Sequence, residues 1–547
     1  MRQLAWGFFL LVCVQAASAQ EHHSVSPPKP TSLLPGLGRH HHPIATKSAE
    51  AQRFFDQGLT LVFGFNHDEA VRSFQRAAEL DPASPMPWWG IALALGPNIN
   101  MPMDEAQHKR AYEALQKALA LTAKAPGNER AYVEALSKRY SSDPKADLMK
   151  LQGEYKNAMA ELVKRYPDDL DAATLYAESL MDLNPWRLWS SDGKPAEGTE
   201  EIVAVLESVL RRDPNHVGAN HYYIHAVEAS PHPEKALPSA KRLETLVPAA
   251  GHLVHMPGHI YMRTGDYAGA ATSNERAAEA DRQYMRATGT EGSMYDFMNY
   301  SHNVHFLAAA CMAEGKFAEA RKAADELVAH VSPVIPQFAI AEFFLPTPYF
   351  ALLRFQRWDE ILNTSAPDPR WTTTTALWHF ARGVAYAGKG NLSAAEAERL
   401  ELAAIESKTV PEVEFGAYFN KARTFLALAG AILDARVATA QGNRKGGIEY
   451  WKKAVELEDS LNYGEPPEWY YPVRESLGGE LLRDGQFAEA EKVFREDLEK
   501  NPRNPRSLFG LMESLKAQKK LTDADWVRRQ FDAAWQNADV KLRVEDL

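Results

Sequence analysis

The chain has 547 residues, of which 45% are hydrophobic and 24% charged, and its formal net charge is −11. This composition is ordinary for a folded soluble protein. The negative charge argues against nucleic acid as a main partner, because phosphate binding requires a basic face. After the first 20 residues no apolar run reaches about eighteen residues, so the sequence predicts no transmembrane helix.

The N-terminal stretch MRQLAWGFFLLVCVQAASAQ is typical of a secretory signal peptide. Arg2 precedes an apolar run, and an Ala-Ser-Ala motif predicts cleavage after Ala19. We therefore expect residues 1–19 to be a signal peptide and the mature protein to be periplasmic or secreted. Only Cys311 remains in the mature chain, so no internal disulfide is expected.

Residues 20–48 are rich in Pro, Gly, Ser and His, which predicts an extended linker or strap. His40, His41 and His42 lie in this segment. They would supply metal ligands if the strap folds back onto the rest of the chain.

Helical periodicity dominates after the strap, and one pattern recurs: a helix, a turn with Gly, a second helix and often a closing Pro. The pattern is seen in residues 51–82, 255–281, 301–327, 376–400 and 474–502. It resembles the tetratricopeptide repeat (TPR) family. The resemblance implies an all-α, right-handed α-solenoid of about ten TPR-like helical hairpins around a concave groove. We expect an N-terminal array over residues 49–340, with a histidine-rich groove, and a C-terminal array over residues 341–547.

The repeat frame can be set from small residues, Gly and Pro without using any histidine. In the 34-residue frame of the family, three units start at Val217, Gly251 and Ser301. Positions 2, 5 and 9 of each unit share one face of its first helix. In the family, that face lines the groove.

Histidine occupies most of these positions. The chain has 18 His in 547 residues, so the nine positions should hold about 0.3 His by chance, but they hold seven. The seven are His221, His225, His252, His255, His259, His302 and His305.

First helices of neighbouring units lie about 10 Å apart, so these imidazoles would converge on one space. We expect them to hold one or two transition-metal ions, Cu or Zn, with Fe also open. Seven imidazoles could fill two three-histidine sites, which would suit a dicopper or dizinc centre. Two alternatives stay open: an anionic ligand bound by partly protonated rings, or purely structural hydrogen bonding.

Pro257 departs from the family pattern because it falls inside the first helix of its unit. Either the helix kinks there, or it begins at Pro257 and leaves His252 and His255 in a loop. Two carboxylates are weaker candidates for a catalytic base or an extra ligand. They are Glu228, three residues after His225, and Glu178.

The stretch 464–474 is a Pro-stiffened aromatic linker before a repeat, which could close the superhelix or touch a ligand. Three other stretches interrupt the repeats: 96–104, 184–193 and 281–300. Long insertions in repeat arrays are often functional, and these could complete a pocket. The chain has no HExxH, Gly-rich phosphate loop or G-x-S-x-G motif, so zincin, phosphate-loop and nucleophile-elbow chemistry are not supported.

The runs NHYYIHAVEAS, GHLVHMPGHIY and EPPEWYYPVR are similar to a group of exported bacterial TPR-repeat proteins of unassigned activity. Two hypotheses follow. The first is an exported solenoid with a histidine-rich metal site, which, if it is an enzyme, would use the ion as a Lewis acid or redox centre and bind a small molecule there. The second is a non-enzymatic scaffold that binds protein or peptide partners in the groove, with Glu475 or Arg506 docking them in the terminal units.

Overall fold

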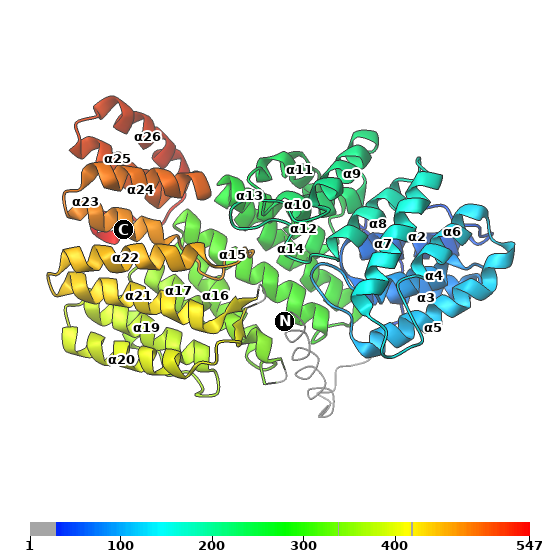
Figure 1. Ribbon diagram of the computed structural model, residues 1–547, viewed down its shortest axis with the longest axis horizontal. Helices are drawn as coiled ribbons and strands as arrows, with labels where there is room; N and C mark the ends of the chain where they lie inside the picture. Colours follow the sequence, from blue (N-terminus) through cyan, green and yellow to red (C-terminus); the bar gives the residue numbers. More distant parts are fainter. Residues whose placement is uncertain (1–28, 337, 417–418) are drawn as a thin grey trace.

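The computed structural model describes residues 29–547 except 337, 417 and 418. The predicted signal peptide lies outside these residues. The described chain is an all-α solenoid of TPR-like helical hairpins (Figure 1), as the sequence predicts. Helices α2 to α9 occupy one side of the molecule and α19 to α26 the other, with α14 and α15 between them. No helix of the described part is both long and apolar enough to span a membrane.

The first half of the solenoid is built from helices joined by turns and by a few longer loops, of which 182–198 is one. Their bounds are α2 (Ala49–Phe63), α3 (His67–Leu80), α4 (Met86–Ala94), α5 (Glu105–Leu121), α6 (Gly127–Leu136), α7 (Leu148–Arg165), α8 (Leu170–Met181), α9 (Thr199–Arg212), α10 (Val217–Val227), α11 (Leu237–Leu246), α12 (Gly251–His255), α13 (Pro257–Thr264) and α14 (Tyr267–Thr288).

The second half continues in the same way, with one two-stranded antiparallel ribbon. Its elements are α15 (Ser301–Glu314), α16 (Phe317–Val331), α17 (Thr347–Arg354), α18 (Trp358–Leu362), α19 (Thr372–Gly388), α20 (Leu392–Lys408), β1 (Glu414–Phe415), β2 (Asn420–Lys421), α21 (Ala422–Ala440), α22 (Arg444–Asp459), α23 (Val473–Arg483), α24 (Phe487–Lys500), α25 (Pro505–Ala517) and α26 (Leu521–Ala534).

The repeat frame set from the sequence matches the helices. α10, α12 and α15 begin at Val217, Gly251 and Ser301, the predicted starts of the three histidine-bearing units. Gly265 and Gly315 end the first helices of the last two units in the left-handed conformation, with φ of 77° and 84°. Residues without a Cβ adopt this conformation most easily, so these two glycines let the chain reverse into the second helix.

Pro257 divides the first helix of the second histidine-bearing unit. α12 ends at His255 and α13 begins at Pro257, and Met256 between them keeps helical dihedrals (φ −52°, ψ −35°). Pro is favourable at the first position of a helix, where no backbone hydrogen bond is lost. His252 and His255 therefore lie on a short helix and not in a loop.

The solenoid curls so that segments distant in sequence meet. The end of α2 packs on α10, where a Cβ on Gly218 would lie 2.5 Å from the Phe63 ring. The turn between α13 and α14 contacts the turn before α25, and the Tyr267 hydroxyl donates to the Pro502 carbonyl at 3.3 Å. Because of this curvature, the groove in the middle of the array is covered by other parts of the chain.

The predicted insertion 281–300 is only partly a loop. α14 continues to Thr288, and a π-helical turn, η3 (Asp296–Tyr300), leads directly into α15. The strap is irregular and folds back onto the array. Its Gly36 carbonyl accepts from Ala249 N at 3.1 Å, and Leu34 N donates to the Gln57 side chain at 2.7 Å.

Candidate metal centre

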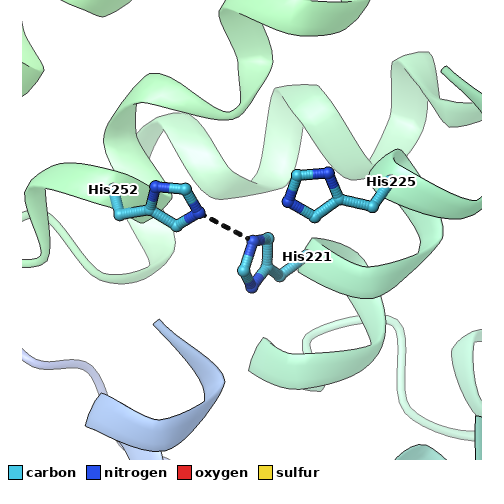
Figure 2. Close-up of side chains that lie close together, drawn as sticks. All are labelled: His221, His225 and His252. Carbon is cyan, nitrogen blue, oxygen red and sulfur yellow. Dashed lines mark hydrogen bonds between the residues drawn. The ribbon is translucent and has the colours of Figure 1, made fainter. Parts of the chain in front are cut away.

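Three of the predicted histidines form what we call the first histidine group: His221 and His225 on α10, and His252 on α12. The rings turn toward a common space (Figure 2). The Nε2 atoms of His221 and His252 lie 3.1 Å apart, and one ring nitrogen from each histidine lies within 4.8 Å of the others. Imidazoles that bind one tetrahedral ion have nitrogens about 3.3 Å apart, so this spacing fits a shared ion.

The second histidine group consists of His255, His259 and His302, on α12, α13 and α15. The Nε2 atom of His255 lies 2.6 Å from that of His259 and 3.1 Å from that of His302. The two groups adjoin. The rings of His225 and His259 are 5.5 Å apart between centroids, and those of His252 and His255 are 5.6 Å apart.

Backbone and amide acceptors fix the ring proton on one histidine of each group. His221 Nδ1 donates to the Phe63 carbonyl at 2.6 Å, and His255 Nδ1 donates to the Asn274 side-chain carbonyl at 2.7 Å. The Asn274 amide cannot be reversed, because its Nδ2 donates to the Ala270 carbonyl at 2.8 Å. A neutral ring with its proton on Nδ1 has a free lone pair on Nε2.

Glu228 orients the rings of His225 and His259 and so links the two histidine groups. Its Oε1 accepts from His225 Nδ1 at 2.8 Å, and its Oε2 accepts from His259 Nδ1. A carboxylate that holds the outer nitrogen of a histidine is the usual support of a metal ligand. Glu228 is therefore placed to orient ligands, and with His225 and His259 it also forms a group that could hold an ion, the extra-ligand role expected from the sequence.

Two glycines allow these supporting groups to approach. Gly218 leaves room for the Phe63 ring, which brings the Phe63 carbonyl to His221. A Cβ on Gly258 would lie 2.6 Å from Asn274 Nδ2, so this glycine lets Asn274 reach His255. The small residues next to the histidines are therefore part of the site's construction.

The ring environment is dry. The exposed fractions of His221, His225, His252, His255 and His259 range from 0 to 7%. Phe65 covers the first group, with its ring stacked on that of His225 at 5.9 Å.

Burial controls the protonation of the rings. It lowers the pKa of His221, His252, His255 and His302 well below the ordinary value, and repulsion from neighbouring imidazoles adds to the effect. Burial also lowers the pKa of His225, against the opposing pull of Glu228. These five rings are therefore neutral at neutral pH, which is the form that binds metal ions.

His259 and Glu228 form a charged pair inside this dry site. Burial acts to lower the pKa of His259, but the charge and hydrogen bond of Glu228 outweigh it and raise the pKa. Burial likewise acts to raise the pKa of Glu228, but His259 and His225 bring it down to about 2. Glu228 is therefore an anion at neutral pH.

Two sequence-predicted residues lie elsewhere. His305 belongs to neither group: its Nε2 contacts the Tyr470 hydroxyl, and its ring packs on Phe344 at 5.1 Å. Burial lowers its pKa to about 3. Glu178 lies in a separate buried charge cluster with Arg139 and Asp182. His305, at position 5 of the third unit, points toward the second half of the chain because the solenoid curls. The repeat frame alone does not reveal this curl.

The strap histidines meet a different set of residues. His40 Nε2 lies 3.0 Å from Asp171 Oδ1, His42 Nδ1 lies 2.7 Å from Asp171 Oδ2, and His216 Nε2 lies 3.2 Å from Asp171 Oδ1. We call these four residues the strap cluster. His41 instead contacts Asp56 and is mostly exposed. The strap does fold back, but its imidazoles do not join the two histidine groups.

Sequence reasoning missed several residues of the site. Phe63 ends α2 and Phe65 lies in the turn before α3, more than 150 positions before the histidines that they contact. Asn274 lies on the second helix of its unit, opposite His255. Asp171 and His216 carry no motif either. Their roles depend on contacts between distant elements, so no local signal in the sequence identifies them.

No protein-family model matches the chain, and no curated protein matches it. Among solved structures, the human IFIT1 dimer with m7Gppp-AAAA is 14% identical, with a TM-score of 0.32, over 90% of this chain and 91% of that chain. Yeast Tom70 is 13% identical, with a TM-score of 0.28, over 88% of this chain and 90% of that chain. These TM-scores are too low to support an argument, so the architecture rests on the helices described above.

Proposed function

We propose that this chain is a transition-metal-binding solenoid that holds two ions side by side, one in each histidine group. The ligands are His221, His225 and His252 for one ion, and His255, His259 and His302 for the other. Three imidazoles and an open fourth position suit Zn or Cu, and Fe is the third candidate. The proposal includes the location outside the cytoplasm that the N-terminal segment predicts.

One observation carries the proposal: if both rings are neutral, His255 and His259 direct two lone pairs at each other. Both rings donate through Nδ1, one to Asn274 and one to Glu228, so neither neutral ring has a proton on Nε2. Yet these Nε2 atoms lie 2.6 Å apart. Two facing lone pairs repel each other unless a cation or a proton lies between them.

A proton accounts for only part of the arrangement. If His259 is an imidazolium, its Nε2 hydrogen satisfies His255. In the first group, however, His225 Nε2 is buried without any hydrogen-bond partner, although Glu228 fixes the ring proton on Nδ1. A buried lone pair without a donor costs free energy, and a metal ion would remove that cost.

The protein's own residues fix the geometry of such a centre. Glu228 holds one ring of each group, and the Phe63 carbonyl and Asn274 hold two more, so four ligands are oriented before any ion arrives. The Phe65 ring excludes water on one side. A bound Cu ion would supply redox chemistry there, and a bound Zn ion would act as a Lewis acid.

The test is elemental analysis of full-length protein purified without a histidine tag and equilibrated with Cu, Zn or Fe. We expect two ions per chain of one of these metals. In the variant His255→Ala/His259→Ala we expect about one ion per chain. His305→Gln is the matched control, because it removes a predicted histidine that lies in neither group, and it should retain two. A folded protein without stoichiometric metal would contradict the proposal.

Partner binding remains the second candidate function, because helical-repeat solenoids commonly present extended binding surfaces. Five of the six histidines of the two groups are buried, which leaves little of them for a peptide to contact. Glu475 and Arg506 are also buried, and they pair with each other at 3.0 Å. The observation that favours a partner is at the C-terminal helix α26, where Leu521 and Trp526 are both 66% exposed. The variant Leu521→Ala/Trp526→Ala should no longer bind a partner protein at α26, and its metal content should be unchanged.

A further inference from the structure

Asp281, on α14, is a fully buried carboxylate beside the helices that carry the second histidine group. Its two oxygens accept from uncharged donors. The Tyr295 hydroxyl donates to Oδ1 at 2.6 Å, and Asn303 Nδ2 donates to Oδ2 at 2.6 Å. Burial raises the pKa of Asp281 to about 7, although the two hydrogen bonds oppose the rise. Burying a carboxylate costs free energy, so its contacts are the place to look for its role.

The contacts of Asp281 join the two helices across which the second histidine group is built. Gly251 begins α12, and a Cβ on this residue would overlap the Asp281 carboxylate, so glycine is what lets the two meet. Asn303 lies on α15 directly after His302. Asp281 therefore holds both helices near the place where His255 on α12 and His302 on α15 bring their Nε2 atoms to 3.1 Å.

α14 acts as the spacer of this group. It packs against α12, α13 and α15, the three helices that bear the group's histidines. Asn274 and Asp281 are seven residues apart on α14 and so share one face of it. Asn274 orients the ring of His255, and Asp281 holds the starts of the two helices.

We propose that Asp281 is a positioning residue of the second histidine group. By holding Asn303 against the start of α12, it sets the separation of α12 and α15 at which His255 and His302 can share one ion. This inference rests on the proposed function. It also gives a role to the insertion 281–300, since Tyr295 from that segment fixes the orientation of the carboxylate.

The expected effect is confined to one ion. Metal–ligand distances tolerate changes of only about 0.2 Å, so a small change in helix separation is enough to weaken a site. The first histidine group lies on α10 and α12 and takes no ligand from α15. Its geometry therefore does not depend on the contact between Asp281 and Asn303.

The experiment measures the Zn affinity of each group separately, by competition with a chelator at pH 8.5, where the Asp281 carboxyl is ionised. The full-length variant His221→Ala/His225→Ala keeps only the second group, and His255→Ala/His259→Ala keeps only the first. Adding Asp281→Leu should lower the affinity of the second group about 10- to 100-fold and leave that of the first group unchanged.

The conservative variant Asp281→Asn should restore binding. Its side-chain oxygen can still accept from Tyr295. Its amide can donate to Asn303 Oδ1, which is buried without a hydrogen-bond partner in the described structure, once the Asn303 amide has turned. The link between α12 and α15 is then kept, and we expect the affinity of the second group to stay close to that of the parent protein.

Asp497→Leu is the matched control for lost stability. Asp497 on α24 is also fully buried, and it accepts from the uncharged side chains of Asn504 and Ser507. This variant should be destabilised without a change in the Zn affinity of either group. If Asp281→Leu does not fold, Asn303→Ala removes only the contact to α15 and should weaken the second group in the same direction.

Co(II) in place of Zn reports the geometry of the second group. Tetrahedral Co(II) absorbs visible light strongly, and Co(II) with more ligands absorbs weakly. We expect the visible band of the second group to weaken in Asp281→Leu and to be unchanged in Asp497→Leu. A loss of stability alone would not move this band in folded protein.

The outcomes separate this inference from the proposed function. Unchanged Zn affinity and an unchanged Co(II) band in folded Asp281→Leu, or an equal loss in both groups, would overturn the positioning role and leave the metal centre intact. Asp281→Asn as weak as Asp281→Leu would overturn it as well. Unmodified protein that binds neither Zn nor Co(II) would overturn the metal centre, and the inference with it.

Discussion

The two histidine groups and the strap cluster are all built from histidines, but the histidines have different roles in them. Both gather imidazoles from distant parts of the chain into a buried space. In the histidine groups the acceptors lie outside the ring of imidazoles: the Phe63 carbonyl, Asn274 and Glu228 hold the Nδ1 protons. In neutral His221, His225 and His255 this leaves the Nε2 lone pair facing inward.

In the strap cluster the acceptor lies at the centre. Asp171 contacts His40, His42 and His216, and these contacts bring its pKa well below the usual range although burial opposes them. His216 Nδ1 accepts from Ala219 N at 3.1 Å and caps α10, so a neutral ring carries its proton on Nε2, which lies 3.2 Å from Asp171 Oδ1. His216 therefore has no lone pair to offer a metal ion.

The comparison shows that the number of imidazoles does not by itself define a metal site. A metal site requires that the ring protons point away from the ion, and the groups that hydrogen-bond to the outer nitrogens of the histidines decide this. By this criterion the histidine groups fit metal binding, and the strap cluster fits an internal latch that fastens His40 and His42 to α8 and to the start of α10.

The largest expected effect comes from a substitution that breaks the latch. Asp171→Asn removes the charge that three imidazoles surround and should lower the free energy of unfolding by about 3 kcal/mol, measured by urea denaturation. Metal content should stay at two ions per chain. If the variant instead lost an ion, the strap cluster would be a metal site and the distinction drawn here would be wrong.

The next effect concerns the support of the histidine groups. Glu228→Gln leaves a neutral group that can accept from only one of the two Nδ1 atoms, so affinity for the ions should fall about 10- to 100-fold, measured by competition with a chelator. Glu178→Gln is the matched control, since Glu178 is buried but contacts none of the six histidines through a hydrogen bond or ion pair in the described structure. Equal affinity in both variants would contradict the supporting role of Glu228.

The smallest effect is a pH dependence confined to the latch. Burial acts to lower the pKa of His40 and His42, but Asp171 outweighs it and raises both values. At these two sites the folded state therefore binds more protons than the unfolded state above pH 6.5. The contribution of the latch to the free energy of unfolding should fall as pH rises through that region, by at most about 1.4 kcal/mol per unit for each proton.

The variant Asp171→Asn, which lacks the charge of the latch, is the control for this pH dependence. The difference in stability between the unmodified protein and Asp171→Asn should be larger at pH 5.5 than at pH 8.5, in protein stripped of metal. A difference that does not change with pH would show that His40 and His42 are not charged in the folded protein.

Much of the fold could be predicted from sequence because TPR-like hairpins are local. The spacing of small residues, Gly and Pro set the starts of α10, α12 and α15 to the residue. The same frame placed six of the seven predicted histidines in one space, because neighbouring hairpins stack with nearly constant geometry. His305 was misplaced, since the chain beyond α15 covers it with Tyr470.

The sequence by itself determined a helical-repeat chain and a concentration of imidazoles on one face, since both follow from periodicity over a few tens of residues. Only the tertiary structure decided which imidazoles keep free lone pairs and which serve a carboxylate. That choice depends on single acceptors such as the Phe63 carbonyl, Asn274 and Asp171, brought from distant helices by the curl of the solenoid. Contacts of this kind leave no periodic trace in the sequence, because each is made once.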